Sequence, residues 1–214
     1  MKRIFISLTA ALVVLGCATA FAGEIPVSSY ETEFLKNEYI SGSFKNLNIV
    51  SPTSSDVLQT IQQQLDKQAS DARQKCLEMT ISTAMTEIPM VIEFEQEQCY
   101  CSSSVISICT SEDLSYGHRE IYKQISGDVY SLYTGQKLKL SDMFNDMDAA
   151  KKVIKGYLGK MASFDMEGAN FYLTSDALVI IQDTTVQSRD NHNFSYQVQI
   201  PKSSLAQCLR SEYR

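Results

Sequence analysis

Three cysteines and a histidine in the middle of the chain have side-chain types that bind metal ions. Cys99, Cys101, Cys109 and His118 match the three-Cys, one-His composition of some zinc sites. Zinc ligands usually occur in pairs separated by about two to four residues, whereas a single residue separates Cys99 from Cys101. On a strand, that spacing would place both thiols on one face. We expect disulfide bonds here and no metal site, because the N-terminus predicts an oxidising compartment.

Five cysteines remain once an N-terminal signal, described below, is removed: Cys76, Cys99, Cys101, Cys109 and Cys208. An odd number of cysteines in an oxidising compartment predicts two disulfides and one free thiol. If the serine-rich segment after Cys101 is a tight turn, Cys99 and Cys109 lie opposite each other on paired strands, within bridging distance. Cys76 and Cys208 would then join a long helix to the C-terminal region, although the connectivity stays open.

Three glutamates, Glu93, Glu95 and Glu97, alternate along one predicted strand. Glycosidases use pairs of carboxylic acids, so acid–base chemistry is one interpretation of this pattern. Such pairs normally come from different segments around a cleft, whereas these three side chains share one strand face. We therefore expect the solvated face of a half-buried strand and assign no catalytic residue to it.

Other catalytic residue types are sparse. His118 and His192 are the only histidines, and neither a Gly-x-Ser-x-Gly nor a His-Glu-x-x-His motif occurs. Cys101 is a candidate thiol nucleophile, but no base lies at a recognisable spacing from it. We predict that the chain is not an enzyme, with a hydrolase acting in the cell envelope as the competing interpretation.

The N-terminus predicts export. Lys2 and Arg3 precede an apolar run over residues 4–15, and the small-x-small motif of a cleavage site (Ala-Phe-Ala) follows. The run is about a dozen residues, shorter than the roughly 20 that span a bilayer. We expect residues 1–22 to be a signal peptide and residues 23–214 to be a single exported domain, periplasmic or secreted.

A second interpretation of this end stays open. The residues before Cys17 resemble a lipobox, in which Cys17 would carry a lipid and become the mature N-terminus. Leu15 is an awkward residue just before the small Gly16, and the Ala-Phe-Ala motif suits ordinary cleavage. Ordinary cleavage is therefore preferred, with a lipoprotein as the alternative.

The chain is acidic. Its formal net charge is −6, and loss of Lys2 and Arg3 with the signal peptide lowers this to about −8. An acidic balance without basic clusters argues against nucleic acid and anionic membrane surfaces as partners. It suits a basic partner or a cationic ligand, and it also promotes solubility. The roughly 190 residues after the signal are enough to bury a sizeable core.

Residue periodicity predicts two amphipathic helices. Apolar residues recur every three or four positions from Leu58 to Met79, after a polar cap, and again from Met147 to Met161. A short terminal helix is expected after Pro201. Alternation and turn residues predict strands over residues 28–34, 43–50, 88–97, 105–109, 120–125, 128–132, 171–173, 177–182 and 194–200.

This order of elements predicts an α+β fold, in which helices pack on one face of a mainly antiparallel sheet. Each half of the chain places a helix before strands, so a division into two similar halves near residue 110 stays open. The sequence contains no short-period repeat, no low-complexity tract and no second long apolar run. One continuous domain is therefore the simplest expectation.

Four short segments, in the same order, resemble a known family. They are Tyr116-Gly117-His118, residues 133–144, residues 171–180, and residues 198–201 followed by Leu205. Together they resemble the extracytoplasmic domain of RsiV-type anti-sigma factors, and a similar domain of unknown function that accompanies PdaC-type peptidoglycan deacetylases. The resemblance extends from about Pro89 to the end of the chain.

The resemblance implies binding rather than catalysis. In the anti-sigma members, this type of domain recognises lysozyme, and in the deacetylase members it accompanies a cell-wall enzyme. This sequence shows no membrane-spanning helix apart from the signal, no sigma-binding segment and no deacetylase domain. Residues 183–193 also depart from the family pattern. We therefore do not expect an anti-sigma factor of the RsiV layout.

We expect an exported, non-enzymatic binding protein of the cell envelope, whose partner is a basic protein such as lysozyme or a cell-wall fragment. Tyr116, His118 and Arg119 are the candidate binding residues, because their turn is expected at an exposed rim. No cofactor is predicted. The alternative is a structural or lipid-tethered envelope subunit.

Overall fold

The structure is a computed structural model, and it describes residues 25, 27–36, 40–50, 55–83, 88–117, 119–159, 164–186 and 192–213. Its helices and strands are β1 (Val27–Lys36), β2 (Ile40–Ile49), α1 (Asp56–Thr83), β3 (Met90–Cys101), β4 (Val105–Tyr116), β5 (Arg119–Ser131), α2 (Met147–Leu158), β6 (Asn170–Leu173), β7 (Ala177–Val186) and β8 (His192–Pro201). Short 3-10 helices span Leu140–Met143, Lys202–Leu205 and Ser211–Tyr213. None of the helices in this described part is long and apolar enough to cross a membrane.

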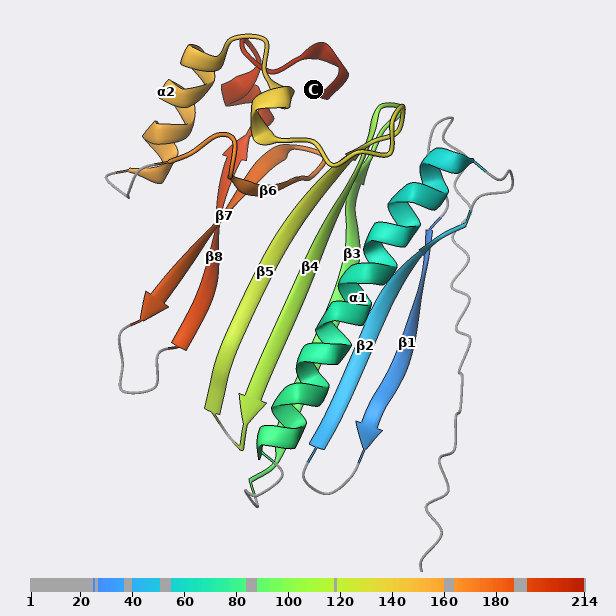
Figure 1. Ribbon diagram of the computed structural model, residues 1–214. Helices are drawn as coiled ribbons and strands as arrows, with labels where there is room; N and C mark the ends of the chain where they lie inside the picture. Colours follow the sequence, from blue (N-terminus) through green and yellow to red (C-terminus); the bar gives the residue numbers. More distant parts are fainter. Residues whose placement is uncertain are drawn as a thin grey trace, which may run out of the picture.

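The described strands pair in the order β1-β2-β3-β4-β5-β8-β7-β6, but the sheet divides into two parts (Figure 1). β1 to β5 form a mixed sheet in which β2 and β3 run parallel and the other neighbours antiparallel. β6 to β8 form an antiparallel sheet. Two parallel residue pairs, Tyr122–Asn193 and Lys123–Phe194, join β5 to β8. The predicted α+β fold with a mainly antiparallel sheet is confirmed.

Each helix is followed by three antiparallel strands. α1 precedes β3, β4 and β5, and α2 precedes β6, β7 and β8. The two units meet where β5 pairs with β8. A division near residue 110 does not fit this arrangement, because residue 110 lies inside β4. The change from one unit to the next falls instead between β5 and α2.

α1 forms because its apolar side chains recur at helical spacing, with no internal Gly or Pro to interrupt the backbone. Ile61, Leu65, Ala69, Ala72 and Cys76 are buried along one stripe of the helix. They pack in two clusters against side chains of β2 to β5, and Figure 1 shows the helix in front of the large sheet, running roughly along its strands. The predicted helix is confirmed.

Buried polar groups tie α1 to the sheet. Gln96 of β3 is 1% exposed, and its side-chain oxygen accepts the backbone N–H of Leu47 at 3.2 Å. Its amide donates to the Leu65 carbonyl at 3.1 Å and to the Gln68 side chain at 3.4 Å. A buried amide group without a hydrogen-bond partner lowers the stability of the fold. These hydrogen bonds therefore hold α1 at a fixed distance from β2 and β3.

The same polar set continues to a buried carboxylate on β5. Asp128 is 1% exposed, and it accepts hydrogen bonds from the Gln68 amide and from the Tyr130 hydroxyl. Its other oxygen pairs with Lys137, whose side chain reaches in from the segment after β5. Burial, together with the neighbouring Asp128 charge, raises the pKa of Tyr130. The Lys137 ammonium therefore balances the carboxylate charge at one oxygen, while both hydrogen-bond donors reach the other oxygen.

β6 crosses over β5 at a glycine. An added Cβ at Gly127 would lie 2.4 Å from the backbone oxygen of Phe171, so only glycine allows this approach. No ladder of backbone hydrogen bonds joins β5 to β6 at this crossing, and two side chains accept the backbone N–H groups instead. The Asn170 side chain accepts the Gly127 N–H at 2.7 Å, and Ser107 Oγ accepts the Leu173 N–H at 2.7 Å.

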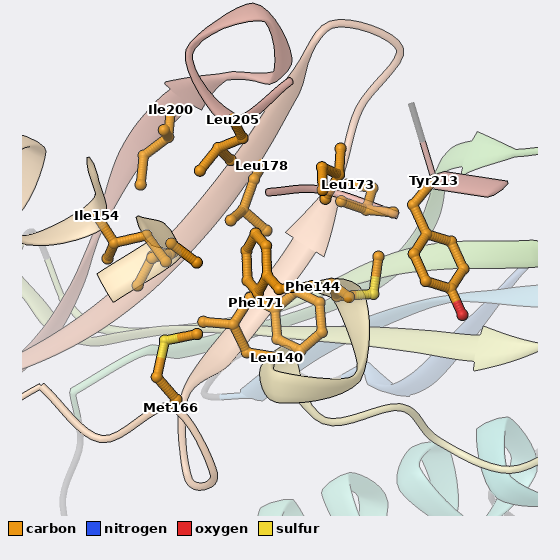
Figure 2. Packing of buried hydrophobic residues seen from close by; sticks show 14 of the residues in the cluster. Leu140, Phe144, Ile154, Met166, Phe171, Leu173, Leu178, Ile200, Leu205 and Tyr213 are labelled. Atoms are coloured by element: carbon orange, nitrogen blue, oxygen red, sulfur yellow. The ribbon is translucent and has the colours of Figure 1, made fainter. Parts of the chain in front are cut away.

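The second core lies between α2, β6 to β8 and the C-terminal segment (Figure 2). Ile154 of α2 packs with Leu178 and Ile200 of the small sheet, and with Leu205 of the 3-10 helix that follows β8. α2 begins at the Asp146 cap, whose side chain accepts the Ala149 N–H at 3.0 Å. Burial of aliphatic and aromatic side chains holds the C-terminal segment onto the small sheet.

Several predicted boundaries differ from the structure. The two strands expected over residues 120–125 and 128–132 are one continuous strand, β5, because Gly127 is a crossing point and not a break. α2 ends before Gly159, whose φ of 70° suits glycine, and not at Met161, which lies outside the described residues. The terminal helix is replaced by two 3-10 helices.

Candidate functional site

The turn expected to form a binding rim joins β4 to β5. Gly117 adopts a positive φ of 63°, and its N–H donates to the Pro89 carbonyl at 2.6 Å. Tyr116 and Arg119 pair across the end of the hairpin. The Tyr116 side chain is half-buried and packs against the α1 core, so it is less exposed than expected. His118, and the side chains of Arg119 and His192, lie outside the described residues.

A narrow cleft opens beside this turn, between the C-terminal half of α1 and strands β3 to β5. Its polar side is formed by Lys75, Glu112 and Tyr122. The Lys75 ammonium lies 2.9 Å from the Glu112 carboxylate and 2.6 Å from the Tyr122 hydroxyl. Burial lowers the pKa of Lys75, but the hydrogen bonds with Tyr122 and Glu112 outweigh burial and raise it. The three groups satisfy one another, which indicates a structural role.

A charged surface covers the face of β1 to β4 that points away from α1. Glu93 and Glu97 are exposed there and Glu95 is half-exposed, while Met90, Ile92 and Phe94 point to the α1 core. The predicted solvated glutamate face is therefore confirmed. We call this surface, with its cross-strand neighbours, the acidic face: Glu31, Lys45, Glu93, Glu95, Glu97, Asp113 and Lys123.

Sheet pairing brings the charges of the acidic face into register. Lys45 stands between Glu31 and Glu95 in the strand ladder and forms an ion pair with Glu95. The next row pairs Glu93 with Asp113, whose carboxylate lies 3.2 Å from the ammonium of Lys123. Five carboxylates therefore face two lysines. The acidic face carries an excess of negative charge.

Glu93 and Glu97 are the two carboxylates of the acidic face that remain available. Neither side chain forms an ion pair or a hydrogen bond with another described residue, whereas Glu95, Asp113 and Glu31 each have one. They lie four residues apart on one strand, on the same face. Their backbone belongs to the interior of the sheet, so the spacing of the two charges is fixed.

A β-bulge separates the cysteines that the spacing predicts on one face. The pairing of β3 with β4 shifts register between Gln98 and Tyr100. Cys99 packs toward the small sheet with Cys109, whereas Cys101 packs in the core beneath α1. The prediction that Cys99 and Cys101 share a face is wrong, because the bulge interrupts the alternation. No three His, Cys, Asp or Glu side chains of the described residues are grouped to hold a metal ion.

No disulfide joins any two of the five described cysteines in the structure. Cys76 is 6% exposed in the core beneath α1, and Cys208 is 2% exposed in the core around α2. Burial raises the pKa of Cys76 to about 11. The predicted Cys76–Cys208 bridge is wrong, because the fold places these thiols in separate cores. Cys99 and Cys109 do lie together. Cys17 lies outside the described residues, so lipidation stays a prediction.

Lys202 is a buried charged residue that the sequence did not single out. It is 8% exposed, and its ammonium lies 3.9 Å from the centre of the Tyr100 ring. No described group forms a hydrogen bond with this ammonium. Burial lowers the pKa of Lys202, although the Asp176 charge partly opposes this. A lysine directly after a strand-ending proline carries no sequence signal for burial.

Lys202→Met is expected to remove a pH dependence of stability without a large loss at neutral pH. The pKa of folded Lys202 is lower than the ordinary lysine pKa of 10.5. At pH values between these two, Lys202 is protonated in the unfolded chain and deprotonated in the folded protein. Unfolding free energy should therefore rise with pH across this window in the wild type, and this rise should be absent from the variant. Urea denaturation at several alkaline pH values measures the difference, and the same dependence of unfolding free energy on pH in both proteins would contradict the buried ammonium.

At pH 7 the wild type and Lys202→Met should differ in unfolding free energy by about 1 kcal/mol or less, because the lost cation–π contact and the removed desolvation offset each other.

Comparison with known proteins identifies the fold. No family model and no curated protein matches the sequence. A DUF3298 family structure from Bacteroides fragilis matches with a TM-score of 0.56 at 13% identity, covering 89% of this chain and 95% of its own. Another, from Pseudomonas aeruginosa, matches with a TM-score of 0.58 at 11% identity, covering 89% of this chain and 96% of its own.

These matches show that the chain has the fold of DUF3298 family proteins across most of its length. That family includes domains of the RsiV and PdaC type, so the fold implied by the sequence resemblance is confirmed. At such low identity the likeness concerns the fold alone.

Proposed function

We propose that this chain is a non-enzymatic, exported binding protein of the cell envelope that recognises a basic protein, with animal-type lysozyme as the first candidate. The acidic face supports this proposal most directly. It presents two unpaired carboxylates, Glu93 and Glu97, on a surface with excess negative charge. Lysozymes of the animal type are basic, so opposite charges would speed their encounter with this face.

The rigidity of the acidic face adds to the argument. β3 is hydrogen-bonded to a neighbouring strand on each side, and its other face is buried against α1. A partner would therefore meet carboxylates that are already in place, which reduces the entropy lost on binding. The sequence resemblance to lysozyme-recognising domains of anti-sigma factors supports the same class of partner.

Charge reversal on the acidic face is expected to weaken lysozyme binding by at least tenfold. The test variant is Glu93→Lys/Glu97→Lys, whose new lysines would repel a basic partner at the centre of the proposed interface. The matched control is Asp66→Lys/Glu78→Lys, which makes the same charge change on the exposed side of α1. Calorimetric titration at low and moderate salt measures both.

The control variant should bind within about threefold of the wild type, because Debye screening limits the effect of charges on the far side. An equal loss of lysozyme affinity in both variants would show that binding depends on the net charge of the chain and not on the acidic face. Binding of the wild type that moderate salt abolishes would also contradict the proposal. A lysis assay in parallel separates an inhibitor, which blocks lysis, from a receptor, which leaves it unchanged.

A further inference from the structure

A pair of thiols lies where the small sheet packs onto β3 and β4. Cys99 and Cys109 both contact the cluster formed by Ile125, Tyr172 and neighbouring side chains of β7. We propose that Cys99 and Cys109 form a disulfide bond by exchange with a low-molecular-weight disulfide, and that this is the single bridge formed among the five described cysteines. This differs from the two-bridge arrangement expected from the sequence.

Strand pairing places these two thiols on one face of the sheet. In the strand ladder, Cys109 stands opposite Glu97, and Gln98 stands opposite Ile108. Cys99 follows Glu97 by two residues, so it shares the face that Glu97 and Cys109 occupy, and the register shift after Gln98 turns Cys101 to the opposite face. Both side chains also pack against the same cluster around Ile125 and Tyr172, so the two thiols lie beside each other on one face of neighbouring strands, as a bridge between strands requires.

The other three described thiols are held apart from this pair and from one another. Cys76 packs in the core between α1 and the end of β3, and Cys208 packs in the core around α2. Cys101 lies on the opposite face of the sheet, in the core around Ile61 and Tyr130. None of these three shares a cluster with another cysteine, so a bond between them would require the cores to open.

The neighbouring Cys109 thiol lowers the pKa of Cys99, whereas the neighbouring Cys99 thiol together with burial raises the pKa of Cys109. The thiolate is the form that attacks disulfides, so these directions favour Cys99 as the attacking thiolate and Cys109 as the resolving thiol.

The exchange balances in two steps. The Cys99 thiolate attacks one sulfur of the small disulfide, forming a mixed disulfide and releasing one thiolate. That thiolate takes the proton of Cys109, and the Cys109 sulfur then attacks Cys99, forming the bond and expelling the second thiolate, which takes up a proton. The protein loses two hydrogen atoms, and the small disulfide is reduced to two thiols.

Intact mass after oxidation tests the proposal. The protein is the full chain with Cys17→Ser, treated with oxidised glutathione and then digested without reduction. A mass decrease of about 2 Da and one linked peptide pair joining Cys99 to Cys109 are expected. Linked peptides that contain Cys76, Cys101 or Cys208, or five alkylatable thiols after oxidation, would overturn the proposal.

Serine variants test the roles of the two thiols. Cys109→Ser should hold glutathione on Cys99 as a stable mixed disulfide, because the resolving thiol is missing. Cys99→Ser should give no linked peptide pair, because Cys109 then has no neighbouring thiol with which to form a bond. Cys101→Ser is the matched control and should form the Cys99–Cys109 bond as the wild type does. Loss of the bond in Cys101→Ser would also overturn the proposal.

Discussion

Gly127→Ala should be among the most destabilising single substitutions in the described part of the chain, lowering the unfolding free energy by about 3 kcal/mol or more. The new methyl would lie 2.4 Å from the Phe171 oxygen and 2.5 Å from its carbonyl carbon. Both are backbone atoms of β6, so no side-chain rotation relieves the overlap. β5 and β6 must separate, which stretches the Gly127–Asn170 and Ser107–Leu173 hydrogen bonds.

Gly156→Ala is the matched control for this prediction. Gly156 lies in α2, and an added Cβ there meets nothing within 4 Å. Alanine has the higher helix propensity, so stability should rise by about 0.5–1 kcal/mol. Urea denaturation measures both variants. A Gly127→Ala protein as stable as the wild type would show that β6 does not cross β5 as closely as described.

Lys137→Met is expected to lower the unfolding free energy by about 2–3 kcal/mol. The Asp128 side chain is 2% exposed, and Lys137 is its charge partner. Removal of the lysine leaves a buried carboxylate with only the Gln68 amide and the Tyr130 hydroxyl as donors. An uncompensated buried charge is far more costly than the loss of an exposed ion pair.

Two further variants separate this explanation from a general effect of losing a lysine. Lys139→Met removes an ion pair with Glu167 in which both side chains are more than half exposed, and it should leave the unfolding free energy nearly unchanged. Asp128→Asn combined with Lys137→Met removes the unpaired buried charge. The double variant should have an unfolding free energy at least about 1 kcal/mol higher than that of Lys137→Met alone. A double variant no more stable than Lys137→Met alone would contradict the buried-charge account.

Local periodicity made most elements predictable. The apolar stripe of α1 and the alternation along β8 depend on neighbouring residues only, so the sequence contains the whole signal. The segments around residues 133–144 and 171–180 gave the resemblance that the solved structures confirm as a fold. Strand lengths were underestimated, because pairing extends β4 and β7 beyond their apolar residues.

Features that depend on distant contacts could not be predicted. The bulge at Gln98 separates Cys99 from Cys101, and nothing in the local sequence distinguishes it from regular alternation. In the sequence, Gly127 indicates a break between two strands. Its actual role, to allow the close approach of β6, depends on a contact with distant residues. The parallel pairing of β2 with β3 likewise depends on how α1 crosses the sheet.

The candidate site was predictable only in part. The sequence showed that Glu93, Glu95 and Glu97 share a solvated face, and the structure confirms this. Glu31 and Asp113 join them only through strand pairing across the sheet, which no local pattern reveals. The acidic face therefore became a candidate surface once β1 to β4 were assembled.

Carboxylate labelling of the complex with lysozyme measures whether Glu93 and Glu97 lie in the interface. Carbodiimide coupling, read by mass spectrometry, reports the accessibility of each carboxylate with and without saturating lysozyme. If the acidic face is the interface, labelling of Glu93 and Glu97 falls at least severalfold in the complex. Asp66 and Glu78 on α1 are then labelled to the same extent as in the free protein. Unchanged labelling of Glu93 and Glu97 in a sample where lysozyme is bound would contradict the proposed interface.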